Sequence, residues 1–373
     1  MAKKQFHKSD KVLGVNSQSS QNSISNVLMG TSPTFCVANS KKGVPFYYEG
    51  RSINDLLPKV KGCQYAWLNI QVDSVEKDGP KVAQALGFSP QLVTNLLKKR
   101  LSGYEDNIFE LGLLLPAVHV NVLDVMIYPL IILMNKERIV TIHGPQITRL
   151  VKFSRYAVTF FKKIPKSLKV IDKLSLVLFR ILDENNERNF DGIRVIQEQG
   201  EIISKFLVEP TGSRDRLGTD LYKIKRALIH YLETLWAALD VAQYLRYGDA
   251  DILTDDPAIL QKYGILGRDL TRQISISEQM STVLASGLEV LQSIYNNQLT
   301  VLNNRLSLLA VWLAILGTAF IVPNTIATVF GTPIGEHLDW HTMMLILILS
   351  TVLSIALAYW AVKKKKLLPK KNH

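Results

Sequence analysis

The sequence predicts an α+β cytoplasmic domain, then a long-helix stalk, then two C-terminal transmembrane helices. Three observations lead to this fold class. Residues 44–166 alternate short apolar runs with turn residues, which is typical of mixed strands and helices. From residue 167 onward the apolar residues recur with a helical period. Near the C-terminus, two apolar segments carry no charged residue and are long enough to cross a bilayer.

The composition fits a membrane protein with a large soluble part. The 373 residues are 47% hydrophobic, which is high for a purely soluble protein and low for a bundle of many spans. The formal net charge is +12, and part of the excess is a lysine-rich tail at Lys363–Lys371, directly after an apolar segment. That position favours contact with anionic lipid headgroups. No nucleic-acid-binding module is recognisable, so we expect no nucleic-acid partner.

Motifs typical of enzymes are absent from the sequence. It contains no Gly-rich phosphate loop and no nucleophile motif. Its two cysteines, Cys36 and Cys63, do not have a metal-binding spacing, and reduced thiols are expected. The chain is therefore not predicted to be an enzyme, and no resident cofactor is expected.

The N-terminal domain is expected to contain strands that meet in hairpins. Residues 65–72 are rich in strand formers. Residues 109–122 indicate either a strand pair or one long strand interrupted at Pro116. Residues 125–134 form an apolar run too short to span a bilayer as a helix, so a buried strand is predicted there. Its partner strand is expected at residues 137–143.

Two helices are expected between these strands. The first covers about residues 79–86 and stops at Gly87. Ser89 is a candidate N-cap for the second, with Pro90 at a favourable first helical position and an expected end near Arg100.

Helical periodicity dominates the predicted stalk. One helix is expected at residues 168–181, a second at 193–206 and a third at 219–247. After Gly267 a helix can continue without a break to Phe330. Such a helix is several times longer than the ~20 residues that cross a bilayer, so it is expected to run from the stalk into the membrane.

The membrane segments are marked by their lack of charge. No residue between Arg305 and Glu336 is charged, and the second uncharged span is followed directly by lysines. By the positive-inside rule these lysines place the C-terminus in the cytoplasm, and two spans then place the N-terminus there too. The expected organisation is a disordered basic tail (1–43), an α/β domain (44–166), a stalk (167–305), a first span (306–330), an extracytoplasmic loop (331–342), a second span (343–362) and a basic cytoplasmic tail (363–373).

A stripe of small and uncharged polar residues follows one face of the long helix. Its members recur alternately every three or four residues, a period of about 3.5. Lipid does not solvate such a face, so it must meet partner helices or water. The pattern alone leaves open both close helix packing and a pore made by several copies of the chain. The candidate pore-lining residues are Asn296, Thr300, Asn303, Ser307, Ala310, Ala314, Gly317, Ile321, Asn324 and Thr328.

Two acidic regions are candidate cation sites. Glu336 and Asp339, between the two spans, could attract cations to the outer mouth of a pore or be solvated loop residues. An acidic segment in the stalk could bind a divalent cation and control opening, or be an exposed turn. Its acids are Asp249, Asp251, Asp255 and Asp256.

Several short motifs occur in an order that resembles the CorA family of divalent metal-ion channels and transporters. The likeness extends over nearly the whole chain after the tail, and the two C-terminal spans and the lysine tail complete it. In the N-terminal domain the motifs are Tyr65-Ala-Trp-Leu-Asn, Leu86-Gly-Phe-Ser-Pro90 and Ile139-Val-Thr-Ile-His143. At the membrane end they are Ser293 through Asn304, Pro323, Thr325-Ile326-Ala327 and Phe330-Gly331.

The resemblance implies a funnel-shaped homopentamer in the inner or plasma membrane that conducts divalent cations passively. Five copies of the first span would line the pore, and the second spans would form an outer ring. By position, Asn296 falls where many family members have an acid at the cytoplasmic mouth, and Asn324 falls near a pore-lining Thr. Asp269 resembles the first acid of a cation-sensing RDxxDH stretch, in which Arg272 and Gln273 replace the second acid and the His.

The largest departure from the family lies at the end of the first span. The family's YGMN signature is Phe330, Gly331, Thr332 and Pro333 here. In the family the Asn ring is held to bind a hydrated cation, which suits Mg²⁺ because this ion gives up water reluctantly. Pro333 has no side-chain oxygen, so Thr332 hydroxyls or backbone carbonyls would have to replace it. Mg²⁺ remains the default ion. Transport of Zn²⁺, Co²⁺ or Ni²⁺, with or without proton coupling, and a non-conducting membrane scaffold or sensor remain alternatives.

Overall fold

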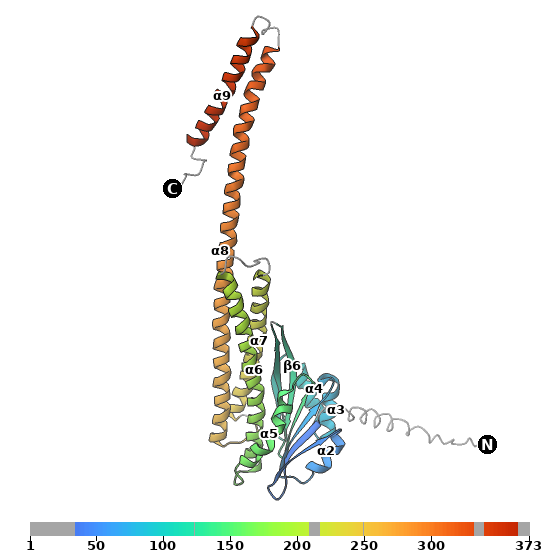
Figure 1. Cartoon of the computed structure of the whole chain (residues 1–373). Coiled ribbons are helices and arrows are strands. Elements are labelled where there is room, and N and C mark those ends of the chain that lie inside the picture. The colour runs from blue at the N-terminus through green and yellow to red at the C-terminus, as the bar shows by residue number, and fades with distance from the viewer. Residues whose placement is uncertain (1–33, 123, 209–216, 249, 332–338, 365–373) are drawn as a thin grey trace, which may run out of the picture. The chain divides into compact units, whose positions relative to one another are not determined.

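The computed structural model describes residues 34–122, 124–208, 217–248, 250–331 and 339–364 (Figure 1). The chain divides into two compact units, Met1–Gly287 and Leu288–His373. One long helix belongs to both units, because α8 extends from Pro257 to Phe330.

The first unit is built on a seven-stranded sheet with the order β2-β1-β3-β7-β6-β5-β4. All neighbouring strands are antiparallel except β3 and β7, which are parallel. The strands are β1 (Thr34–Asn39), β2 (Pro45–Gly50), β3 (Tyr65–Gln71), β4 (Gly103–Asn107), β5 (Glu110–Asn121), β6 (Asp124–Met134) and β7 (Arg138–His143).

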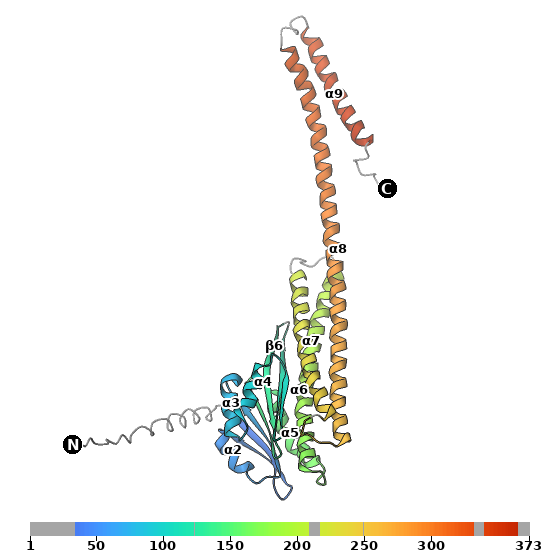
Figure 2. The ribbon, with the colours of Figure 1, turned by 180° about the vertical axis from the view of Figure 1, so that it is seen from behind.

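Helices cover both faces of this sheet (Figures 1 and 2). One face carries α2 (Ile53–Val60), α3 (Val75–Ala85) and α4 (Pro90–Lys98). The other carries α5 (Arg149–Lys163), α6 (Val170–Val208) and α7 (Leu217–Tyr247).

Strand β3 is buried on both faces of the sheet. Its alternate residues Ala66, Leu68 and Ile70 enter the core with α2, α3 and α4. Trp67 points the other way and stacks on Phe153 of α5, with ring centroids 5.0 Å apart. The near-continuous apolar run of β3 is therefore the pattern of a strand buried on both sides.

Buried polar side chains join the two parallel strands. Trp67 Nε1 donates to Thr141 Oγ1 at 3.1 Å, and Thr141 Oγ1 lies 2.8 Å from the Asn69 carboxamide. His143 Nδ1 donates to Gly144 O at 2.7 Å, and Nε2 lies 3.0 Å from the Asn69 carboxamide. Burial lowers the pKa of His143 to about 4, so the ring is neutral at pH 7. His143 is thus a structural residue of the sheet.

The part of α8 in the first unit presents a buried face. Asp256 caps the helix, since its Oδ1 accepts from Ala258 N at 2.9 Å. Tyr263 Oη donates to Ser175 O at 2.7 Å, and Gln273 Nε2 donates to Asn186 Oδ1 at 2.9 Å, so both contacts reach α6. The buried residues of this face include Ile259, Tyr263, Leu266, Leu270, Gln273, Ile274 and Ser277.

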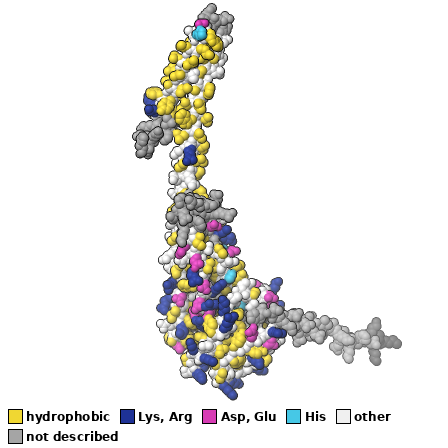
Figure 3. All heavy atoms as spheres, viewed as in Figure 1, with side chains coloured by type: hydrophobic (Ala, Val, Ile, Leu, Met, Phe, Trp, Pro, Cys, Tyr) yellow, Lys and Arg dark blue, Asp and Glu magenta, His cyan; other side chains and the backbone are white. Residues whose placement is uncertain are grey.

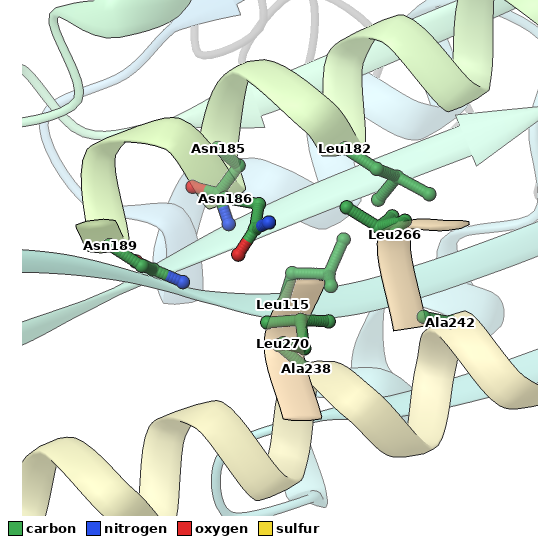
Figure 4. A pocket seen from close by; sticks show the side chains of 9 residues that line it. All are labelled: Leu115, Leu182, Asn185, Asn186, Asn189, Ala238, Ala242, Leu266 and Leu270. Atoms are coloured by element: carbon green, nitrogen blue, oxygen red, sulfur yellow. The ribbon is translucent and has the colours of Figure 1, made fainter. Parts of the chain in front are cut away.

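A small pocket lies between α6, α7, α8 and β5 within the first unit (Figure 4). Leu115, Leu182, Leu266 and Leu270 make much of its wall, and three asparagines of α6 supply the polar part: Asn185, Asn186 and Asn189. About 10 Å³ is open to the centre of a water molecule, which is room for roughly one water. Neither side-chain atom of Asn189 has a hydrogen-bond partner among the described residues.

The expected disordered tail is wrong for residues 34–43. β1 lies between β2 and β3, and Phe35, Cys36, Val37 and Ala38 are fully buried. This apolar run is short and flanked by polar residues, so the composition of the surrounding window concealed it. The rest of the expected tail lies outside the described residues.

The strand predictions are confirmed for β3, β6 and β7, and residues 110–121 form one strand, β5. Pro116 does not interrupt β5, because it is paired with Pro129 of β6 in the register. Pro116 O instead accepts from Asn185 Nδ2 at 3.1 Å. The strands β2 and β4 were not predicted.

Some helix boundaries also differ from the predictions. α4 begins at Pro90 with Ser89 as its N-cap, as predicted, whereas α3 begins at Val75 because Ser74 Oγ accepts from Lys77 N at 3.4 Å. α6 is one helix of 39 residues instead of two. The polar residues between the two expected helices have buried partners; the Asn186 carboxamide, for example, accepts from Gln273.

The long helix also begins earlier than Gly267. α8 starts at Pro257 and includes Gly264, where a Cβ atom would lie 3.1 Å from Arg246 Nε. Gly264 therefore permits close approach of α7 instead of marking a helix end. α2 and α5 were not predicted.

Candidate functional site

The second unit consists of the last part of α8 and of α9 (Trp340–Lys364), which are antiparallel (Figures 1 and 2). Both helices are long and apolar enough to cross a membrane. Only 11% and 6% of their most apolar windows are buried inside the structure, so neither is a core helix of a soluble fold. Figure 3 shows hydrophobic side chains over much of the visible surface of this unit. These helices are therefore candidate membrane spans.

Three different faces can be distinguished on α8 in this unit. Among described residues 292–364, only Ile315, Ala319 and Ser354 are buried, which marks the face where α8 and α9 meet. A second face carries large exposed apolar side chains suited to lipid: Leu309, Leu313, Leu316 and Phe320. The predicted polar stripe occupies the third face. At about 3.6 residues per turn, its centre lies roughly 130° from Ile315 and roughly 110° from the lipid-like face.

The stripe residues lie on the exposed surface of α8. From Asn296 to Thr328 every member of the stripe is exposed except Gly317, which is half-buried. A face of Asn, Thr, Ser, Ala and Gly on an otherwise apolar helix is costly to leave in lipid. The single chain therefore leaves a polar face that needs further copies or water.

The two threonine hydroxyls of the stripe already have partners in their own helix. Thr300 Oγ1 donates to Asn296 O at 2.8 Å, and Thr328 Oγ1 donates to Asn324 O at 2.8 Å. With the proton directed at the backbone, each hydroxyl oxygen keeps its lone pairs for a donor. Such oxygens can accept from the water shell of a cation.

Pro323 lies inside α8, directly before Asn324. Proline has no N–H, so the carbonyl of Ala319 cannot receive its usual intrahelical bond from this position. The helix nevertheless continues to Phe330. The backbone around Asn324 thus has one hydrogen bond fewer than the rest of the span.

Charged side chains are nearly absent from the stripe face. Arg305 lies two residues from both Asn303 and Ser307, which on a helix places it roughly opposite the stripe. Glu289 continues the stripe upstream and is exposed. No other stripe member carries a charge. The face therefore has no positive side chain and one negative side chain at its upstream end.

The signature positions are only partly described. Phe330 ends α8, and Gly331 N donates to Ala327 O at 3.0 Å. Thr332, Pro333 and Glu336 lie outside the described residues. Asp339 precedes α9, and its backbone O accepts from Met343 N at 3.1 Å. Its carboxylate role at an outer mouth stays a prediction.

The candidate sensing acids occupy separate positions. Asp256 caps α8, Asp251 and Asp255 are exposed, and Asp249 lies outside the described residues. Asp269 is exposed on α8 near Asp183 of α6, and its charge contributes to the raised pKa of Asp183, which burial mainly causes. Within the described part of the chain, no group of three or more His, Cys, Asp or Glu side chains is arranged to hold a metal ion.

A buried ion-pair cluster on α5 and α6 has no local signal in the sequence. Glu184 is fully buried and accepts from Arg149 Nε at 2.8 Å, and it also binds Arg180 and Tyr156. Burial, with the Glu184 carboxylate second, raises the pKa of Tyr156. The partners lie on α5 and α6, so only the fold brings them together.

The comparisons with known proteins agree with this architecture. The family model described as "CorA-like Mg2+ transporter protein" matches residues 63–364. The chain belongs to the CorA family. No curated protein matches it.

Solved structures with the CorA fold extend over most of the chain. The complete CorA magnesium transporter of Methanocaldococcus jannaschii is 16% identical, with a TM-score of 0.66, covering 90% of this chain and 98% of that one. The full-length CmaX protein is 18% identical, with a TM-score of 0.60 and the same coverage. The ZntB cytoplasmic domain of Vibrio parahaemolyticus RIMD 2210633 is 14% identical, with a TM-score of 0.52, covering 71% of this chain and 98% of that domain. At these identities the likeness concerns the fold.

The CorA family assignment makes this chain a membrane protein with two candidate spans at its C-terminal end. A soluble α/β domain followed by a long helix and a terminal helix is the architecture shared with the solved CorA structures.

Proposed function

We propose that this chain is a passive divalent-cation channel whose pore is lined by the polar stripe of α8. The observation that carries the proposal is the exposure of this stripe on an apolar helix whose α9-facing side lies elsewhere. Assembly of several copies around the stripe would remove it from lipid and provide an aqueous path.

The proposed assembly is a homopentamer in the cell membrane, with both termini in the cytoplasm. The family supports the pentamer, and the lysines at the end of α9 support the orientation by the positive-inside rule. Five stripes would surround the axis, and α9 would lie outside them. The lysine tail would contact anionic headgroups.

Mg²⁺ is the default ion of the proposal, because the matched family model is that of Mg²⁺ transporters. The cation is the transported ligand and could also regulate opening. An uncharged stripe offers hydroxyl and amide oxygens, which can bind a hydrated ion through its water shell. No enzymatic step is needed, since the gradient and the membrane potential would drive the ion.

A second candidate rests on the signature. Thr332 and Pro333 stand where the family has Met and Asn, so the amide ring that suits hydrated Mg²⁺ is lost. This favours transport of Zn²⁺, Co²⁺ or Ni²⁺, with or without proton coupling. A scaffold or sensor that no longer conducts is the remaining alternative.

Ion flux into liposomes tests the proposal. The purified chain is reconstituted, and uptake of Mg²⁺, Zn²⁺, Co²⁺ and Ni²⁺ is followed with and without a pH gradient, against empty vesicles. The proposal expects uptake of at least one of these ions. A folded oligomer that takes up none of the four would contradict it and favour the scaffold.

A further inference from the structure

A basic cavity opens at the end of the first unit where the β1–β2 turn, the start of β3 and the α5–α6 connection meet. Its volume is about 430 Å³. Figure 3 shows several Lys and Arg side chains over the lower end of this unit. We propose that this cavity binds a small anion with one or more phosphate groups. The residues that carry the proposal are Lys41, Lys42, Lys162, Lys166 and Lys173.

The lining of the cavity has one sign of charge. Five of its thirteen residues are lysines, and none is an Asp or Glu. No carboxylate of the described residues forms an ion pair with any of the five. A concave surface of uniform charge concentrates ions of the opposite sign. The cavity is therefore electrostatically suited to an anion.

Lys173 makes the strongest case, because it is 7% exposed and lines the cavity. Its Nζ donates to Lys166 O at 3.0 Å, which uses one of the three N–H donors of an ammonium group. The neighbouring carboxylate of Asp172 has other partners: Oδ1 accepts from Thr254 Oγ1 at 2.6 Å, and Oδ2 accepts from Lys169 N at 3.3 Å. A buried charge without a counter-ion is costly, and an anion in the cavity would offset that cost.

The start of α6 adds to the positive potential. Lys173 lines the cavity and lies in the first turn of this helix of 39 residues, the end at which the helix dipole is positive. The Asn39 carboxamide oxygen is buried without a donor among the described residues, and a ligand hydroxyl or a bound water would supply one. Gln64 also lines the cavity, and its Nε2 donates to Lys41 O at 3.2 Å.

The volume and the lining of the cavity indicate the class of anion. About 430 Å³ is within the range of roughly 300–1,000 Å³ that small-molecule sites occupy. Tyr65 and Phe161 form part of the wall, but both are buried and stacked on each other, with centroids 5.3 Å apart. The stacking covers one face of each ring, so that face is not offered to a base. Phosphate oxygens, which accept charge-assisted bonds from several lysines at once, fit this lining best.

Calorimetric titration of the full chain in detergent, in metal-free buffer of constant ionic strength, tests the site. Sodium pyrophosphate and ATP serve as phosphate ligands and adenosine as the uncharged comparison. We expect saturable binding of both phosphates and none of adenosine. Lys173→Met should weaken binding by about tenfold or more, since a charge-assisted bond is lost.

A matched pair of double variants guards against a folding defect. Lys41→Gln/Lys162→Gln removes two exposed lysines of the cavity, and Lys163→Gln/Lys169→Gln removes two exposed lysines that do not line it. The first pair should weaken binding about tenfold, and the second should change it less than about twofold. Equal loss in both pairs, or no saturable heat in the wild-type chain, would overturn the site. The proposal does not depend on ion conduction, which liposome flux tests separately.

Discussion

The two parts of α8 carry stripes with a similar period of about 3.5 residues, but one stripe is apolar and buried and the other is polar and exposed. In the first unit the repeating positions from Ile259 to Ser277 are mostly apolar and are buried against the chain's own helices. In the second unit the repeating positions from Asn296 to Thr328 are small or polar and exposed. Where the two patterns overlap, buried Leu284 lies roughly opposite exposed Ser286. The first stripe is satisfied within one chain, whereas the second requires other copies or water.

The largest expected effect concerns the buried stripe. Leu270→Ala removes a side chain that is 2% exposed, so we expect a loss of about 2–5 kcal/mol in the free energy of unfolding. Leu316→Ala, on the exposed lipid-like face of the same helix, should cost less than about 0.5 kcal/mol. Thermal unfolding of both variants in detergent measures the contrast. Equal losses would mean that the two parts of α8 are packed alike.

The next largest expected effect is a pH dependence of stability that arises in the first unit. His143 has a pKa of about 4 in the folded chain, below its ordinary 6.5, so protonation favours the unfolded state. The stability that neutral His143 contributes to the folded state is fully present above pH 6.5 and is lost as the pH falls toward 4. Between pH 7.5 and 5 the loss should be roughly 2 kcal/mol. His143→Gln should lack this part of the pH dependence in thermal unfolding.

The polar stripe itself should not titrate over that range. None of its residues from Asn296 to Thr328 is ionisable. Flux is measured between pH 7.5 and 5 without a pH gradient. We expect no pH-dependent change in flux that is caused by a stripe residue. Any change caused by His143 should disappear in His143→Gln. A step that disappears only on substitution of a stripe residue would contradict an uncharged path.

A bulky residue on the stripe should block flux without unfolding the chain. Ala314→Phe places an aromatic ring on the exposed polar face, and we expect uptake to fall by about tenfold or more through an apolar constriction. Leu316→Phe is the matched control, because it makes a similar change on the lipid-like face. The control should stay within about twofold of wild type. Similar losses in both variants would argue for helix packing instead of a pore.

The smallest expected effect comes from a near-isosteric change. Asn324→Leu keeps the size of the side chain but removes an exposed amide, so we expect uptake to fall roughly threefold to fivefold. Phe320→Leu, on the lipid-like face, is the comparison. Unchanged flux in Asn324→Leu would mean that Asn324 does not line the path.

The sequence was informative where periodicity is strong and weak where partners are distant. The apolar runs of β3, β6 and β7 were long enough to read, whereas β1 depends on a run of only four apolar residues inside a polar segment. Two helices were expected where α6 is continuous, and the partner of Asn186 in the middle of α6 is Gln273, 87 residues away. Such long-range hydrogen bonds have no local signal.

The candidate path shows the same division. The stripe could be identified from spacing alone, because its residue types contrast with the apolar faces around it. The face that meets α9 could not, since Ile315 and Ala319 look like any other apolar positions of a span. The buried Lys173 was equally hidden, because its burial depends on the turn between α5 and α6.

Cysteine accessibility along α8 tests the central claim most directly. In a background with Cys36 and Cys63 replaced, single cysteines are placed at Ser307, Ala310, Ala314 and Gly317 on the stripe and at Leu309, Leu313 and Leu316 beside it. A charged, membrane-impermeant thiol reagent is added to the reconstituted chain, and labelling and flux are measured. We predict that the stripe positions are labelled and lose flux, while the lipid-like positions are not. Equal labelling of stripe and lipid-like positions would contradict a pore lined by the stripe. Unchanged flux after labelling at all four stripe positions would contradict it as well.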